Sequence, residues 1–124
     1  MTRRPRSPGR RARPGGRGVG APLWRIVLGH ERCGAITATI DAIHTGGTAP
    51  GHIGTIVDSL RPVVEPVLNQ PGDPVENAVG ANIAAQVRAL SARSLIIAEK
   101  VRQGALRVVG ARYDLDNGRV SLVS

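Results

Sequence analysis

The chain is poor in the residue types that mark several large classes of protein. It has one cysteine, Cys33, which excludes an intrachain disulfide framework and any zinc finger built from several cysteines. Nowhere do about 20 apolar residues follow one another, so the sequence predicts no membrane span. Its 124 residues are enough for one domain and little more. The sequence therefore predicts a single small domain that is not held together by disulfides.

Acidic residues are missing from the N-terminal part of the chain, and this absence accounts for the net charge of +8. Residues 1–25 contain eight arginines and no Asp or Glu, whereas the nine basic and nine acidic residues of 26–124 cancel. The basic character thus belongs to the beginning of the chain and gives no information about the remainder.

Residues 1–22 are rich in Arg, Pro and Gly, with almost no large apolar side chain. Such a segment cannot bury enough apolar surface to offset its ordering entropy, so we expect a disordered tail. No apolar stretch follows the arginines, as a secretory signal requires, and we expect a cytoplasmic protein. Three interpretations of the tail stay open: a solvated extension, an arm that attracts nucleic-acid phosphates, or the product of a wrong start or reading frame in a GC-rich gene. No aromatic residue precedes Trp24 to stack on bases, which disfavours nucleic-acid binding.

Residues 23–124 have the pattern of strands and helices that is typical of an α/β domain. The expected elements are a buried strand at 23–29, helices at 35–44, from 51, from 74 and at 91–103 (the last a second helix or a bent extension), and strands at 105–113 and 119–123. Pro62 and Pro66 should end or kink the second of these helices. Asp116-Asn117-Gly118 predicts the turn of a C-terminal antiparallel hairpin.

Two helix ends have clear local signals. Asp73 and Pro74 suit the N-cap and the first position of the third helix, and Glu76 stands at the third position. Gly104 suits the residue after the last helix, because glycine readily adopts the left-handed conformation found there.

One pair of residues has the chemistry of a metal site. His30 and Cys33 follow the first expected strand at its carboxyl end, where open α/β sheets place ligand sites. Cys33 also lies at the N-terminus of the next helix, whose dipole favours a thiolate. Imidazole nitrogen with soft sulfur suits Zn²⁺ better than Mg²⁺ or Ca²⁺. From the spacing alone, a buried free cysteine beside a solvent-facing histidine remains the alternative. His44 and His52 are expected at the surface.

The segment around this pair resembles a known family. Residues 26–36 read Ile-Val-Leu-Gly-His-Glu-Arg-Cys-Gly-Ala-Ile, which is similar to the second zinc-ligand segment of the β-class carbonic anhydrases, where a strand ends in Gly-His-x-x-Cys-Gly-Ala. Residues 82–90, 104–115 and 117–120 resemble further segments in the family's order and spacing, so the resemblance covers about residues 23–124.

This resemblance implies a partial β-carbonic-anhydrase sheet of about three strands, mostly parallel, with an antiparallel C-terminal hairpin and packed helices. The family hydrates CO₂ reversibly to bicarbonate, using a zinc-bound water whose pKa is lowered. It follows that His30 and Cys33 would be two of the zinc ligands. Gly34 would let the backbone approach the metal and the substrate closely.

The chain departs from the family's pattern upstream of this segment. The family supplies another zinc-ligating Cys from a Cys-x-Asp-x-Arg segment, and these 124 residues contain none. We therefore interpret residues 23–124 as a truncated, C-terminal half of the domain. Because a catalytic zinc normally has three protein ligands, we expect impaired activity.

The same departure predicts partners. A missing first strand would leave the strand at 25–29 with a free edge, which favours a homo-oligomer or a complementing fragment. A two-fold dimer that joins two His30–Cys33 pairs would form a closed, structural zinc site. The alternative function is that of a non-enzymatic fragment, or of a protein that binds nucleic acid or another partner through its basic tail.

Overall fold

The computed structural model describes residues 20–123. The tail predicted at 1–22 lies outside this range except for its last three residues, which have no regular secondary structure. Three strands and four α-helices make up the described part, with one 3₁₀ turn. They are β1 (Leu23–His30), α1 (Gly34–Thr45), α2 (His52–Val64), η1 (Glu65–Val67), α3 (Pro74–Arg93), α4 (Leu95–Arg102), β2 (Leu106–Tyr113) and β3 (Val120–Leu122).

The strands form one sheet in the order β1-β2-β3. β1 and β2 are parallel, and their register runs from Leu23 opposite Leu106 to His30 opposite Tyr113. β2 and β3 are antiparallel. The predicted α/β class, with a parallel pair and an antiparallel C-terminal hairpin, is therefore confirmed.

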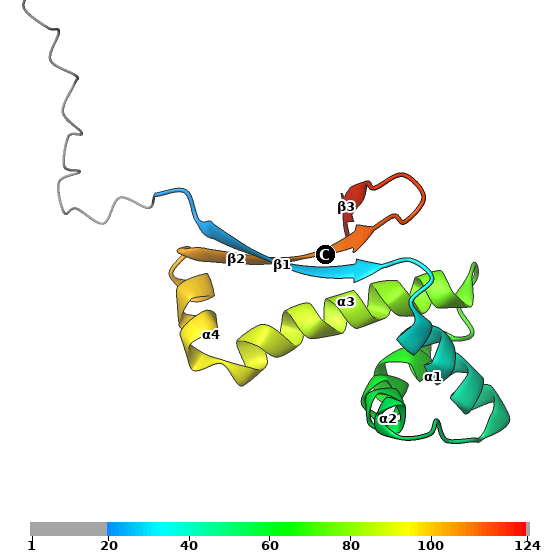
Figure 1. Ribbon diagram of the computed structural model, residues 1–124. Helices are drawn as coiled ribbons and strands as arrows, with labels where there is room; N and C mark the ends of the chain where they lie inside the picture. The colour runs from blue at the N-terminus through cyan, green and yellow to red at the C-terminus, as the bar shows by residue number, and fades with distance from the viewer. Residues whose placement is uncertain (1–19, 124) are drawn as a thin grey trace, which may run out of the picture.

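Helix α3 covers one face of the sheet and lies against both β1 and β2 (Figure 1). Its residues Val79 and Ile83 are 2% exposed. Gly29 of β1 permits this contact, because a Cβ atom there would lie 2.6 Å from Cδ1 and Cγ1 of Ile83. A larger residue at this position would push the helix away from the strand.

Helices α1 and α2 pack together at the carboxyl end of β1 (Figure 1). Their apolar faces join the face of α3 in one buried core, as the helical spacing of the isoleucines predicts. The buried members are Ile36, Ile40, Leu60, Val64, Ala78, Val79 and Ile83. This core fixes the start of α1, and with it the turn that follows β1.

The predicted helix ends are present. The carboxylate of Asp73 accepts hydrogen bonds from the N–H groups of Val75 and Glu76. The carboxylate of Glu76 pairs with Arg112 of β2 and so ties the start of α3 to the sheet. Gly104 has a φ of 72°, and the N–H groups of Gly104 and Ala105 donate to carbonyls of the last turn of α4.

Two boundaries differ from the sequence prediction. Pro62 does not end α2, because the helix continues to Val64. The α-helix ends there, two residues before Pro66, which lies in the 3₁₀ turn. Asp58, whose carbonyl lies one turn before Pro62, is exposed, so water can replace the hydrogen bond that proline does not donate. The second break lies at Ser94, where an extended residue separates α3 from α4 and its hydroxyl caps the new helix.

The prediction that the first strand is buried is wrong. Leu23, Ile26 and Leu28 are 71%, 57% and 55% exposed. Within residues 20–123, β1 pairs with β2 alone, and no helix covers the face of the sheet opposite α3 (Figure 1). The strand is apolar because its sequence is that of a central strand, but the described residues bury only one of its faces.

We call this uncovered face the open face. The register places its large apolar side chains on all three strands: Trp24, Ile26, Leu28, Tyr113, Val120 and Leu122. The guanidinium of Arg107, opposite Trp24, lies 5.3 Å from the centroid of the indole ring. The open face and the free edge of β1 together form an apolar surface that protein domains normally cover.

Candidate metal-binding site

The two predicted zinc ligands stand at the two ends of one tight turn. His30 is the last residue of β1, and Cys33 is the N-cap of α1. Only Glu31 and Arg32 separate them. The strand and the helix therefore fix one ligand each, and the turn fixes the path between them.

The ring of His30 is held by its neighbour. Its Nδ1 atom lies 2.9 Å from the carbonyl oxygen of Glu31. A carbonyl oxygen only accepts, so Nδ1 carries the hydrogen and the lone pair resides on Nε2. Histidines that bind metals commonly donate their second ring nitrogen to a carbonyl in this way. The exposed His30 side chain thus has its lone pair on Nε2, the ring atom that could bind a metal.

Cys33 is held through its backbone. Its carbonyl accepts from the N–H and the hydroxyl of Thr37, at 3.0 and 3.1 Å, and so forms part of the first turn of α1. The side chain is half-buried against the core and makes no cap hydrogen bond. A free thiol at the positive end of a helix dipole suits a metal-binding thiolate.

Gly34 follows as the first residue of α1. A Cβ atom at this position would meet nothing within 4 Å. The contacts among residues 20–123 therefore do not require glycine here, and the role that the resemblance implies for Gly34 remains a prediction.

The turn is attached to the β2–β3 hairpin by residues that the sequence prediction gave no structural role. The carboxylate Oε1 of Glu31 accepts from the N–H groups of Leu115 and Asp116, at 2.6 and 3.2 Å. The Arg32 guanidinium donates to both carboxylate oxygens of Asp116, at 3.3 and 3.1 Å. No local signal links these residues, because they lie 84 positions apart.

Glu31 of the turn forms an acidic cluster with Asp114 and Asp116 of the hairpin, and their carboxylate oxygens lie within 4.8 Å of one another. Its members have other functions in the fold, since Asp114 also accepts from the backbone of the turn. The pKa of Asp114 is lowered, first because the N–H of Asp116 donates to its carboxylate. The cluster thus binds turn amides and Arg32, and we assign no metal to it.

A third ligand does not join His30 and Cys33 within residues 20–123. The acidic cluster is the one group of three His, Cys, Asp or Glu side chains there that converges closely enough for a metal. His44 and His52 are exposed, as predicted, on the last turn of α1 and the first of α2.

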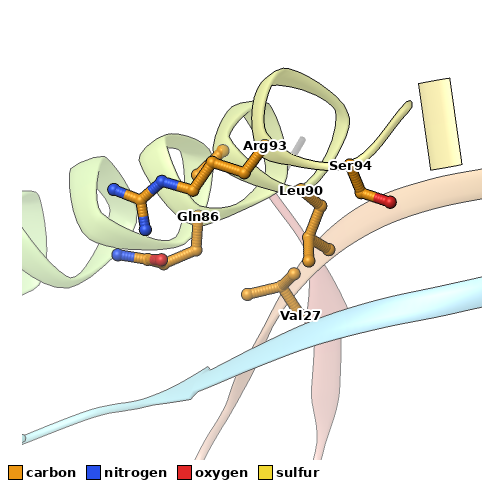
Figure 2. Close-up of a pocket in the computed structure, with 6 residues that line it drawn as sticks. Val27, Gln86, Leu90, Arg93 and Ser94 are labelled. Atoms are coloured by element: carbon orange, nitrogen blue, oxygen red, sulfur yellow. The ribbon is translucent and has the colours of Figure 1, made fainter. Parts of the chain in front are cut away.

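Two shallow apolar depressions adjoin β1. One, of about 260 Å³, borders the candidate site and is lined by Leu28, Gly29, His30, Tyr113 and Leu115. The other, of about 210 Å³, lies between β1 and α3, where Leu90 points toward Val27 and Gln86 and Arg93 stand at its side (Figure 2). An apolar wall beside His30 suits a small, uncharged substrate.

The sequence profile described as carbonic anhydrase matches residues 25–120. This chain belongs to the carbonic anhydrase family. Carbonic anhydrase 2 of Mycobacterium tuberculosis is 34% identical over 97 residues, which make up 78% of this chain and 47% of that protein. The carbonic anhydrase of Mycolicibacterium smegmatis is 32% identical over 99 residues, 80% of this chain and 48% of that protein.

Solved structures identify the fold of this carbonic anhydrase chain as that of the β class. The β-carbonic anhydrase CcaA matches with a TM-score of 0.63 and 22% identity, over 81% of this chain and 46% of that one. The β-carbonic anhydrase CafA of Aspergillus fumigatus also matches with a TM-score of 0.63, at 23% identity over 82% of this chain and 48% of that one. The chain thus spans about half the length of the relatives it matches. Within its described residues, no helix has the length and apolarity to cross a membrane.

Proposed function

We propose that this chain binds Zn²⁺ through Nε2 of His30 and Sγ of Cys33, as part of a carbonic anhydrase site for CO₂ and bicarbonate. The observation that supports this most is the hydrogen bond from Nδ1 of His30 to the Glu31 carbonyl. It fixes the tautomer and restrains the ring, which leaves Nε2 as the ligand atom.

The donor set also fits zinc chemically. One imidazole nitrogen and one thiolate sulfur match its preference for nitrogen and sulfur ligands. Zinc, when bound, supplies the Lewis acidity that makes a water molecule acidic near neutral pH. The residues of the chain orient the two ligands and place an apolar surface, formed by Leu28, Tyr113 and Leu115, beside His30.

We further propose that these residues alone form an incomplete site. Catalytic zinc centres normally use three protein ligands and keep one position open. Among residues 20–123, no third His, Cys, Asp or Glu side chain converges with both His30 and Cys33. The chain also spans about half of each relative that it matches. Full activity then requires a further ligand from another polypeptide segment, and the free edge of β1 is where we expect this segment or a second copy to associate.

Metal analysis of the purified 124-residue chain tests the first part of this proposal. We expect the chain to take up zinc, and His30→Ala and Cys33→Ser each to lose most of this binding. His44→Ala is the matched control, because His44 is an exposed histidine outside the turn, and it should bind zinc as the unchanged chain does. Equal zinc binding by all four proteins, or none by any, would remove the assignment.

Rapid-mixing measurement of CO₂ hydration tests the second part. The zinc-loaded chain should be slow, and the rate should rise when a segment that completes the site is added. Tight, stoichiometric zinc together with rapid hydration by the chain alone would show that the site is complete.

A further inference from the structure

One residue, Glu31, holds the turn between the two candidate ligands through three separate groups. Its N–H donates to the carbonyl of Tyr113 at 3.2 Å and extends the pairing of β1 with β2. Its carboxylate accepts the two hairpin amides of Leu115 and Asp116. Its carbonyl accepts from the ring of His30. The position of Glu31 therefore sets the orientation of the imidazole directly.

Arg32 completes the attachment on the other side of the turn. It is the one non-glycine residue among 20–123 with a positive φ, 52°, a conformation that L residues rarely adopt. This left-handed step reverses the chain so that Cys33 can begin α1. Both side chains of the Arg32–Asp116 ion pair are exposed, whereas the side chain of Glu31 is 17% exposed. The ion pair therefore stabilises the turn less than the hydrogen bonds of Glu31 do.

We propose that Glu31 is a positioning residue for the metal site. By anchoring the turn to the hairpin formed by β2, β3 and residues 114–119, it fixes the separation and direction of His30 and Cys33. This inference rests on the proposed zinc site. It adds that a hairpin distant in sequence, which supplies no ligand, determines the affinity of that site.

A different role for Glu31 has to be separated from this one. As a member of the acidic cluster, its carboxylate is close enough to two others to act as a ligand itself. The Oε1 atom already accepts two amide hydrogens, however, which argues for an anchoring role. Glutamine keeps a carbonyl oxygen with two lone pairs but lacks the negative charge, so Glu31→Gln distinguishes the two roles.

Titration of the full chain with Co²⁺ alone tests the proposal, because the thiolate-to-cobalt absorption band reports bonding to Cys33 without any need for activity. We expect Glu31→Ala to weaken Co²⁺ binding by about 10-fold or more, as loss of an outer hydrogen bond does at other metal sites. Glu31→Gln should restore most of the affinity and the position of the band. Glu99→Ala is the matched control, since the Glu99 side chain pairs with Arg102 and Gln103 at the end of α4, away from the turn.

Three results would overturn the positioning role. Unchanged binding and an unchanged band in Glu31→Ala would show that the turn needs no anchor. Binding by Glu31→Gln as weak as that of Glu31→Ala would show that the charge, or direct ligation, is what matters. Absence of the band in the unchanged chain would refute the zinc site together with the positioning role.

Hydrogen exchange on the metal-free chain distinguishes these failures and detects a variant that does not fold. In Glu31→Ala, faster exchange confined to the turn and to the amides of Leu115 and Asp116 is expected. If exchange accelerates throughout the domain, Glu31→Ala does not fold normally and its Co²⁺ affinity is not used. The Co²⁺ affinity of Glu31→Gln, expected to be near that of the unchanged chain, then tests the positioning role. Unchanged exchange at the hairpin would refute the anchor even where metal binding differs.

Discussion

The contact between Gly29 and α3 gives a prediction whose sign and size follow from the structure. Replacing Gly29 with alanine adds one methyl group, 2.6 Å from two carbon atoms of Ile83. Carbon atoms normally lie about 3.5–4.0 Å apart, so the Ile83 side chain, or the helix that carries it, must shift by roughly 1 Å. Ile83 is 2% exposed, so the close contact lies inside the packed core. Overpacking of this kind costs about 1–3 kcal/mol.

Part of this cost is offset in the unfolded chain. Alanine loses less backbone entropy on folding than glycine does, by about 0.5–1 kcal/mol, so the expected net loss for Gly29→Ala is between about 0 and 2.5 kcal/mol. Gly80 of α3 is the matched control, since a Cβ atom there meets nothing within 4 Å. Gly80→Ala should stabilise the protein by about 0.5–1 kcal/mol, because alanine is the better helix former.

Urea unfolding of the four combinations of Gly29→Ala and Ile83→Ala measures the contact itself. Ile83→Ala alone should cost about 2–5 kcal/mol through the cavity it leaves. In that background the added methyl group has room, so Gly29→Ala should become neutral or stabilising. The coupling between the two sites should then be at least about 1 kcal/mol. A Gly29→Ala cost that is the same in both backgrounds, or a stabilising effect like that of Gly80→Ala, would refute the close approach of α3 to β1.

Four further predictions follow from other contacts. Asp73→Ala should lower the unfolding free energy by about 0.5–2 kcal/mol through loss of the N-cap, whereas the exposed Asp41→Ala should change it by less than about 0.5 kcal/mol; equal effects in urea unfolding would contradict the capping role. Ile26→Lys, on the open face, should reduce concentration-dependent self-association in sedimentation experiments with little change in stability, and undiminished association would show that other surfaces are responsible. Because the pKa of Asp114 is lowered in the folded chain, its carboxylate stabilises the fold at pH values above the ordinary pKa of 3.8, and this contribution is lost as the pH falls through the folded-state pKa. The Asp114→Asn variant should therefore lose less stability on acidification than the unchanged chain. An identical dependence of stability on pH in the two proteins would be inconsistent with this. Deletion of residues 1–22 should leave both the unfolding free energy and zinc binding unchanged, since the domain is predicted to begin at residue 23; a large loss of either would place part of the domain in the tail.

The elements of the fold that could be read from the sequence are those with local causes. Asp73 caps α3 because its carboxylate reaches N–H groups two and three residues away, and Gly104 ends α4 because its own backbone tolerates a positive φ. The turn with His30 and Cys33 belongs to the same group, since the two candidate ligands lie three positions apart. In such cases the residue type and its immediate neighbours already specify the geometry.

The burial of β1 could not be read in this way. A run of apolar residues predicts a strand, but it does not state how many neighbours the strand finds. Ile26 and Leu28 are exposed because the described residues provide one neighbouring strand and one covering helix. Burial is a property of the assembled layers, and residues 20–123 supply only one of the two layers expected around a parallel pair.

By itself, then, the sequence determined the order of the elements, the helix ends at Asp73 and Gly104, the pair of candidate ligands and the family resemblance. The tertiary structure alone decided what holds that pair in place. Glu31 accepts hydrogen bonds from the hairpin amides, Arg32 pairs with Asp116, and Gly29 packs against Ile83. The residue type does not reveal the partner, because a carboxylate or a guanidinium can form hydrogen bonds equally to water or to a distant turn. Contacts between residues 84 positions apart are therefore specified only when the sheet and its helices bring the two segments together.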